Sequence, residues 1–214
     1  MNKKVNAEKR FIDIKILLIA FVILAVLTVI MWHSSSKNDA VDIPEGNSTL
    51  AEYICLSPNA TSPRENKITK ITIHHMAANL SLTEVGSLFS QTERKVSSNY
   101  AIDSSGRIGL YVSEKDRAWS SSNSENDSRA VTIEVANDET GGMWHVSDAA
   151  YNSLIDLCVD ICRRNDIKEL DFTGDADGNL TIHKMFDSNT QCPGPYLESR
   201  MKDIAYEVNR QLCQ

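Results

Sequence analysis

Side chains that bind borderline metal ions stand at three places in the chain. The pair His74-His75 ends a β-branched stretch, His183 follows a second apolar stretch, and Cys192 comes nine residues later, before a Pro-Gly-Pro turn at 193–195. Neutral imidazole and thiolate are the usual zinc ligands, and a catalytic zinc site takes three protein ligands and leaves one position for water. Two histidines and one cysteine match that count, with His74 or His75 as the first.

The same residues also have simpler interpretations. A histidine pair on a strand is more often structural or on the surface, and a single cysteine in an apolar setting is usually part of a core. A structural zinc site is another alternative, and it would need a fourth protein ligand. His75, Asp187 and Cys213 are the candidates for that ligand, and none has convincing spacing.

The five cysteines are too few and too dispersed for a disulfide scaffold. Cys158 and Cys162 stand four apart in a helical pattern, which favours two small core residues over a bridged pair. Cys55 and Cys213 lie near the two ends of the polar part of the chain and are candidates for a bridge. An odd count leaves at least one cysteine unpaired, and a metal ligand would account for it.

Periodicity predicts the elements that must position these residues. Strands are expected at 70–74, 130–135 and 180–183, and a hairpin at 99–103 and 107–111. Capping signals predict helices that begin after Ser81 and Ser147, and a last helix covers about 196–212. Residues 119–128 are rich in serine and asparagine and predict a loop. Strands interleaved with helices predict an α/β domain with a central sheet.

The N-terminal part has a different composition. Residues 1–15 carry five Lys or Arg, and residues 16–32 are apolar without charge, Pro or Gly. This pattern predicts a membrane-spanning helix with the N-terminus in the cytoplasm and the rest of the chain outside. A cleaved signal peptide is the alternative, but no A-x-A site follows. Residues 33–49 are polar and predict a flexible linker, so the folded domain is expected over 50–214.

A net charge of −7 argues against nucleic acid as the main partner, because phosphate binding needs a basic surface. No internal repeat is visible. We expect a monomer.

Several stretches, in order, closely resemble the N-acetylmuramoyl-L-alanine amidases, the family shared by phage endolysins and the peptidoglycan recognition proteins. They cover most of residues 66–210 and read ITIHHM at 71–76, NYAID at 99–103, RAVTIEVAN at 129–137, HKMF at 183–186 and TQCPGP at 190–195. The resemblance implies a mixed β-sheet flanked by helices. It also implies a bacterial cell-wall enzyme that acts on peptidoglycan, and the predicted membrane helix places that enzyme outside the cytoplasmic membrane.

The resemblance also implies roles for individual residues. The zinc ligands would be His74, His183 and Cys192, with His75 pointing to the other face of its strand. Tyr100 would line the catalytic centre, and Thr190 would stabilise the reacting oxygen. The family usually places the second histidine and the cysteine eight apart, whereas the gap here is nine.

These assignments predict zinc-dependent hydrolysis of the amide between N-acetylmuramic acid and L-alanine. Glu134, which matches a strand glutamate near the metal, is the first candidate for general base, and Tyr100 is the second. Glu134 could instead only anchor a metal ligand. Trp119 could stack on a sugar or be buried. The alternative function is a peptidoglycan-binding module without activity, which loss of a metal ligand would signal.

Overall fold

The computed structural model describes residues 41–214. The predicted basic segment, the predicted membrane helix at 16–32 and the first part of the predicted linker lie outside the described residues. Within residues 41–214, no helix is both long enough and apolar enough to cross a membrane.

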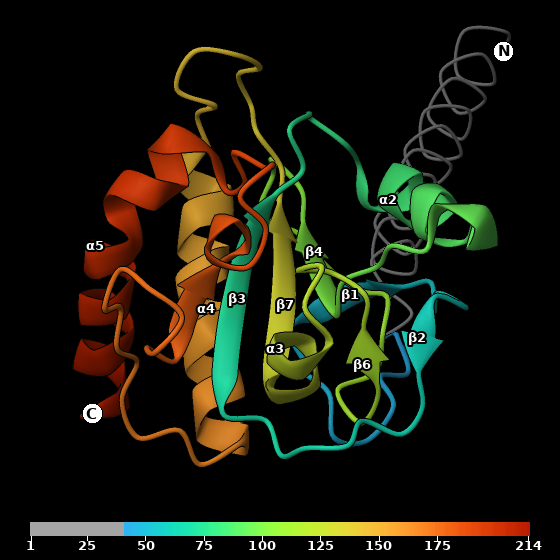
Figure 1. Ribbon diagram of the computed structural model, residues 1–214, viewed down its shortest axis with the longest axis horizontal. Coiled ribbons are helices and arrows are strands. Elements are labelled where there is room, and N and C mark those ends of the chain that lie inside the picture. Colours follow the sequence, from blue (N-terminus) through green and yellow to red (C-terminus); the bar gives the residue numbers. More distant parts are fainter. Residues whose placement is uncertain (1–40) are drawn as a thin grey trace, which may run out of the picture. The chain divides into compact units, whose positions relative to one another are not determined.

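A six-stranded mixed sheet forms the centre of the described domain, with strand order β1-β5-β4-β7-β3-β8 (Figure 1). The strands are β1 Ala51–Ile54, β3 Lys70–His75, β4 Tyr100–Ile102, β5 Ile108–Leu110, β7 Ala130–Val135 and β8 Leu180–Ile182. β7 and β3 lie in the middle and are parallel to each other and to their outer neighbours, while β4 and β5 form the antiparallel hairpin. This arrangement confirms the predicted fold class for the domain. A separate two-stranded sheet joins β2 Ala60–Thr61 to β6 Arg117–Ala118.

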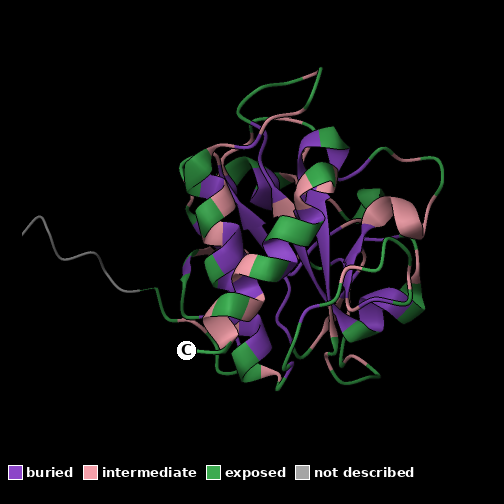
Figure 2. Ribbon diagram, turned by 90° about the vertical axis from the view of Figure 1, so that its left-hand side faces the viewer, coloured by how far each residue is buried: buried purple, intermediate pink, exposed green. Residues whose placement is uncertain are grey.

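Two long helices cover one face of the sheet. These are α4 Asp148–Arg164 and α5 Gly194–Leu212, which pack on each other and on the sheet (Figure 1). Both carry a stripe of apolar residues that is buried and an opposite face that is exposed, whereas the strands are buried along most of their length (Figure 2). Cys158 and Cys162 belong to the buried stripe of α4, as predicted.

Shorter helices occupy the other face and its edges. α2 Leu82–Phe89 begins at Ser81, whose hydroxyl accepts from the Glu84 N–H in the predicted capping box, and it packs near β4. α3 Ser124–Arg129 lies against β6 and β7. Two single turns of 3-10 helix, η1 Thr92–Arg94 and η2 His183–Met185, complete the set.

Three sequence predictions need correction. The predicted loop at 119–128 contains most of α3, because the Asn123 side chain accepts from the Asn126 N–H and starts a helical turn in a polar sequence. Cys55 and Cys213 are free thiols, so they form no bridge. The domain also begins before Leu50, because Ile43, Asn47 and Ser48 pack on it.

A buried carboxylate joins that first segment to the domain. Glu114 is 3% exposed, and its carboxylate accepts from two Arg164 nitrogens, at 2.6 and 2.9 Å, and from the Tyr100 hydroxyl at 2.6 Å. The Tyr100 oxygen in turn accepts from the Ser48 N–H at 2.8 Å, and Asn47 Oδ1 accepts from the Glu114 N–H. Because of these bonds, Asn47 and Ser48 are fixed on the domain, although composition alone assigned them to a flexible linker.

We expect Glu114→Ala to lower the free energy of unfolding by about 3 kcal/mol. The change leaves the Tyr100 hydroxyl buried without its acceptor and leaves Arg164 without its principal partner. Breaking a buried ion pair costs about 3–5 kcal/mol. The cost here is expected at the low end of that range, because the Arg164 side chain is 25% exposed. Urea denaturation measures the loss, with Glu139→Ala, at an exposed site, as the control. A loss below about 0.5 kcal/mol for Glu114→Ala would contradict the stabilising role of the network.

Candidate active site

Two central strands place an imidazole beside a carboxylate. β3 and β7 pair so that His74 lies opposite Glu134. Their neighbours Ile73 and Ile133 pack into the core under α4 and α5, and side chains alternate along a strand, so His74 and Glu134 point to the other face. His74 Nδ1 lies 3.9 Å from Glu134 Oε1.

His183 reaches the same place from the adjacent edge strand. It follows β8, which pairs with β3, and it opens the 3-10 turn η2, where its carbonyl accepts from the N–H of Phe186. The turn redirects the chain and brings the His183 ring to His74, with ring centroids 4.8 Å apart.

Cys192 arrives on the loop between η2 and α5. The His75 N–H donates to Cys192 Sγ at 3.4 Å, and the Lys184 N–H donates to the Cys192 carbonyl at 3.1 Å. These two bonds attach Cys192 to the end of β3 and to η2. One ligand atom from each of His74, His183 and Cys192 lies within 4.8 Å of the others. Among the described residues, this is the only group of three or more His, Cys, Asp or Glu with that geometry.

The electrostatics of the three residues suit a bound cation. Burial lowers the pKa of His74 far below its usual value, an effect that His183 and His75 increase, and burial also lowers the pKa of His183. Both imidazoles are therefore neutral and keep a lone pair for a metal. Burial raises the pKa of the Cys192 thiol, with a further contribution from Glu134, so a metal ion is what would stabilise its thiolate. The donor set and its chemistry fit zinc.

Glu134 lies at the border between this group and a cavity. Burial raises the pKa of its carboxyl to about 8, and its Oε2 is buried without a hydrogen-bond partner. The side chain is 18% exposed, toward a cavity of about 160 Å³. The other lining residues come mainly from α2 and its flanking loops and are apolar except for His75 and Arg94: His75, Met76, Leu80, Val85, Leu88, Phe89, Arg94 and Val96. A carboxylate next to a metal group and open to a cleft is placed to exchange protons with a bound molecule.

A family model described as N-acetylmuramoyl-L-alanine amidase matches residues 64–195, which contain all of these residues. The chain belongs to this amidase family. It is thus an enzyme of the amidase class, as the sequence motifs predicted. No curated protein matched the chain in sequence.

Solved structures support the same fold. A mutant of PlyL superimposes with a TM-score of 0.58 at 17% identity, over 73% of this chain and 96% of that one. A selenomethionine derivative of AmpD gives 0.55 at 20% identity, over 79% and 98%. A mutant endolysin from Bacillus subtilis gives 0.54 at 14% identity, over 73% and 97%. At these identities the likeness concerns the fold, and the described domain of the amidase corresponds to nearly the whole of each neighbour.

The structure does not bring Tyr100 to the metal group, and its predicted role there needs correction. Tyr100 is opposite Ile133 in the β4–β7 pair and packs with it under α4, on the face away from Glu134. Its hydroxyl donates to Glu114, and burial and that carboxylate raise its pKa well above the usual value. The residue of β4 that lies opposite Glu134 is Ala101, the next residue after Tyr100. Because side chains alternate between the two faces of a strand, Ala101 faces the site and Tyr100 faces away from it.

Thr190 lies next to the metal group. Its hydroxyl oxygen accepts from the Cys192 N–H at 3.1 Å, which leaves its O–H free to donate. Thr190 therefore lies beside the Cys192 backbone, and its part in the reaction is a proposal.

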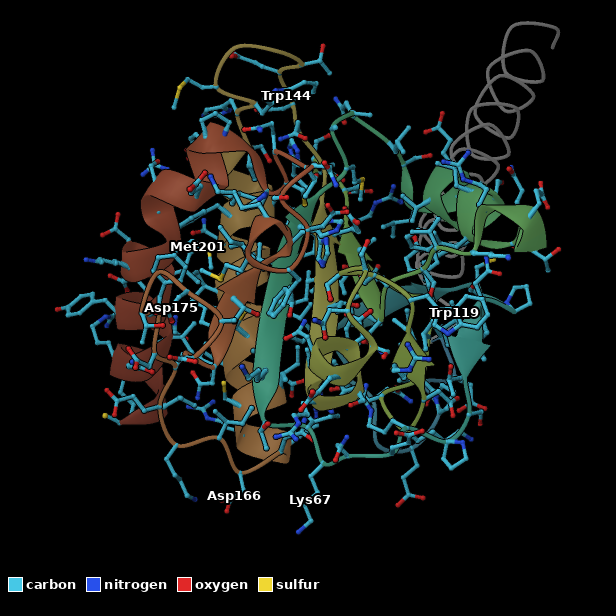
Figure 3. The ribbon with its side chains drawn as sticks, in the orientation of Figure 1. Lys67, Trp119, Trp144, Asp166, Asp175 and Met201 are labelled. Carbon is cyan, nitrogen blue, oxygen red and sulfur yellow. The ribbon has the colours of Figure 1, made fainter. Side chains whose placement is uncertain are left out.

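Trp119 and Trp144 lie in different parts of the domain (Figure 3). The Trp119 indole N–H donates to Thr61 Oγ1 at 2.9 Å, in the small two-stranded sheet, so its polar edge is already occupied away from the site. The Trp144 ring meets the His75 ring edge-on, with centroids 5.4 Å apart. Of the two, Trp144 is the one that contacts the His75 ring, and sequence reasoning did not select it.

Sequence reasoning also missed Ser120, Asp127 and Arg94. Ser120 and Asp127 fall in a stretch that the sequence predicts to be a loop, and Arg94 falls between the predicted helices and strands. Nothing in their spacing indicates that they approach His74 or Glu134.

Proposed function

We propose that the amidase binds zinc through His74, His183 and Cys192 and hydrolyses the amide between N-acetylmuramic acid and L-alanine. The observation that carries this proposal is the convergence of two neutral imidazoles and one thiol within 4.8 Å, beside a carboxylate that faces a cavity. Three protein ligands and one open position are what a catalytic zinc site requires.

A zinc ion held there would polarise the scissile carbonyl and lower the pKa of a water molecule to about 7. Glu134, which lines the cavity, would accept the proton of the attacking water on its carboxylate and pass it to the leaving amine of L-alanine. A bound cation would favour the carboxylate form of Glu134, which is the form that a base needs. The Thr190 O–H would donate to the carbonyl oxygen as negative charge develops on it.

A structural role for the metal group is less well supported. Cys213 is an exposed residue at the end of α5, and the Asp187 carboxylate accepts from Asn189 at 2.9 and 3.0 Å. Neither joins the group of three, and His75 contacts Cys192 through its backbone N–H. Among the described residues no fourth ligand is in place.

The test is digestion of purified peptidoglycan by the full-length chain, with and without a chelator. Mass spectrometry should detect stem peptides with free L-alanine N-termini, which disappear with chelator and return with zinc. If the protein binds peptidoglycan and releases no stem peptide even with added zinc, the binding-module alternative replaces the catalytic one. If activity survives complete removal of metal, the zinc proposal fails.

We also propose that the cavity beside Glu134 receives the stem peptide, with Arg94 meeting one of its carboxylates. Among the described residues that line the cavity, Arg94 is the only cationic one. Arg94→Gln should raise KM about fivefold with little change in kcat, because the contact is equal in the ground and transition states and is exposed to solvent. Steady-state kinetics on muropeptides measure this, with Lys202→Gln on α5 as the control. An unchanged KM, or a fall in kcat alone, would contradict this placement.

We propose further that residues 16–32 anchor the amidase in the bacterial cytoplasmic membrane, with the domain outside and acting on nearby wall. The support is the uncharged apolar run behind a basic segment. Carbonate extraction of membranes and external protease treatment of spheroplasts test the anchor and its orientation. Release by carbonate, or a mature N-terminus beyond residue 32, would refute it.

A further inference from the structure

A serine hydroxyl contacts the metal-binding imidazole that is most deeply buried. Ser120 Oγ lies 3.1 Å from His74 Nε2, and both side chains are almost completely buried. A neutral imidazole carries its proton on only one nitrogen, and the bond made by one nitrogen decides which state the other adopts. If Ser120 accepts from Nε2–H, the free lone pair is on Nδ1, the nitrogen that faces Glu134 at 3.9 Å.

Ser120 is held in place by a buried carboxylate. Asp127 is 2% exposed, and its Oδ2 accepts from the Ser120 N–H at 2.9 Å. Its Oδ1 accepts from the Ser121 N–H at 3.1 Å and from the Ser121 hydroxyl at 2.6 Å. One carboxylate therefore fixes the backbone of two consecutive residues, and the bonds to a charged acceptor are among the stronger ones in a protein.

The same segment is tied to β3. Asn126 Nδ2 donates to Thr72 Oγ1 at 3.0 Å and to Ser121 Oγ at 3.2 Å, and Thr72 precedes His74 by two positions on the same face of the strand. These bonds hold the segment that carries Ser120 against the strand that carries His74.

We propose that Asp127 and Ser120 act as positioning residues, which hold the His74 ring with Nε2 protonated and Nδ1 directed toward the metal. The ring-positioning part stands on the metal-free geometry, and its effect on zinc rests on the proposed function. Losing such a partner of a metal-binding histidine lowers metal affinity about 10- to 100-fold.

The experiment measures zinc affinity and the His74 tautomer in the full-length protein. Zinc affinity comes from competition with a chromophoric chelator, and the tautomer comes from long-range ¹H–¹⁵N spectra of the metal-free, ¹⁵N-histidine-labelled protein. The variants are Ser120→Ala, Asp127→Asn and Ser120→Thr, which keeps the hydroxyl. Ser124→Ala is the matched control, because Ser124 is an exposed serine of the same segment.

We expect the Nε2–H tautomer of His74 in the wild type and in Ser120→Thr. Zinc affinity should fall about 10- to 100-fold in Ser120→Ala and Asp127→Asn, and should stay within about threefold of wild type in Ser120→Thr and Ser124→Ala. Thermal unfolding of the metal-free proteins separates this from a general loss of fold, because Ser120→Ala should keep a near-wild-type midpoint.

Two results would overturn the inference: an Nδ1–H tautomer in the wild type, or zinc affinity in Ser120→Ala and Asp127→Asn within twofold of wild type. A third result separates the two proposals. If the wild type shows the Nε2–H tautomer and Ser120→Ala does not, but the wild type binds no zinc, the ring positioning is supported and the proposed function is refuted. The two failures are therefore distinguishable.

Discussion

Cys192→Ala is expected to abolish tight zinc binding and to reduce amidase activity at least about 10³-fold. The change removes the thiolate from a group of three donors, and two imidazoles alone do not complete a catalytic zinc site. A metal ion contributes several kcal/mol to stabilising the transition state, and each 1.36 kcal/mol corresponds to a factor of ten in rate. Metal content after dialysis and release of stem peptides from peptidoglycan measure the two effects.

Cys213→Ala is the matched control for this variant. Cys213 is a free, exposed thiol at the end of α5, so its removal changes the thiol count without touching the metal group. It should retain wild-type zinc content and activity. If Cys192→Ala kept stoichiometric zinc and most of its activity, Cys192 would not be a ligand and the proposed centre would be wrong.

Glu134→Gln is expected to lower kcat by about 10²- to 10⁴-fold, the usual contribution of a general base. Glutamine keeps the shape of the side chain but cannot accept a proton. Because Glu134 is not one of the three donors, zinc content should remain close to wild type. Steady-state kinetics on a soluble muropeptide, together with metal analysis, give both quantities, and Glu139→Gln at an exposed site is the control.

The pattern of these two readouts decides between the roles considered for Glu134. A base is indicated by a large fall in kcat with unchanged zinc affinity. A residue that only orients His74, from which it is 3.9 Å away, should instead lose about 10- to 100-fold in zinc affinity. In that second case, activity would recover at saturating zinc, and the proton would have to be taken by another group.

The sequence by itself determined the central strands, the helices α2, α4 and α5, and the metal-binding residue types. The β-branched runs at 70–74 and 130–135 form the central strands, and the capping signals at Ser81 and Ser147 start α2 and α4, because these features act over a few neighbouring residues. The motifs around His74, His183 and Cys192 also indicated the family that the chain belongs to. Their convergence agrees with the ligand set that those motifs implied, although the ion itself is a proposal.

Only the tertiary structure decided which other residues reach that group. The register of β3 against β7 places His74 opposite Glu134, and the pleat of β4 turns Ala101 toward the site and Tyr100 away from it. The contact between Ser120 and His74 joins residues 46 positions apart. Local sequence patterns cannot predict such contacts, because side chains alternate every residue along a strand and a shift of one position exchanges the two faces of the sheet.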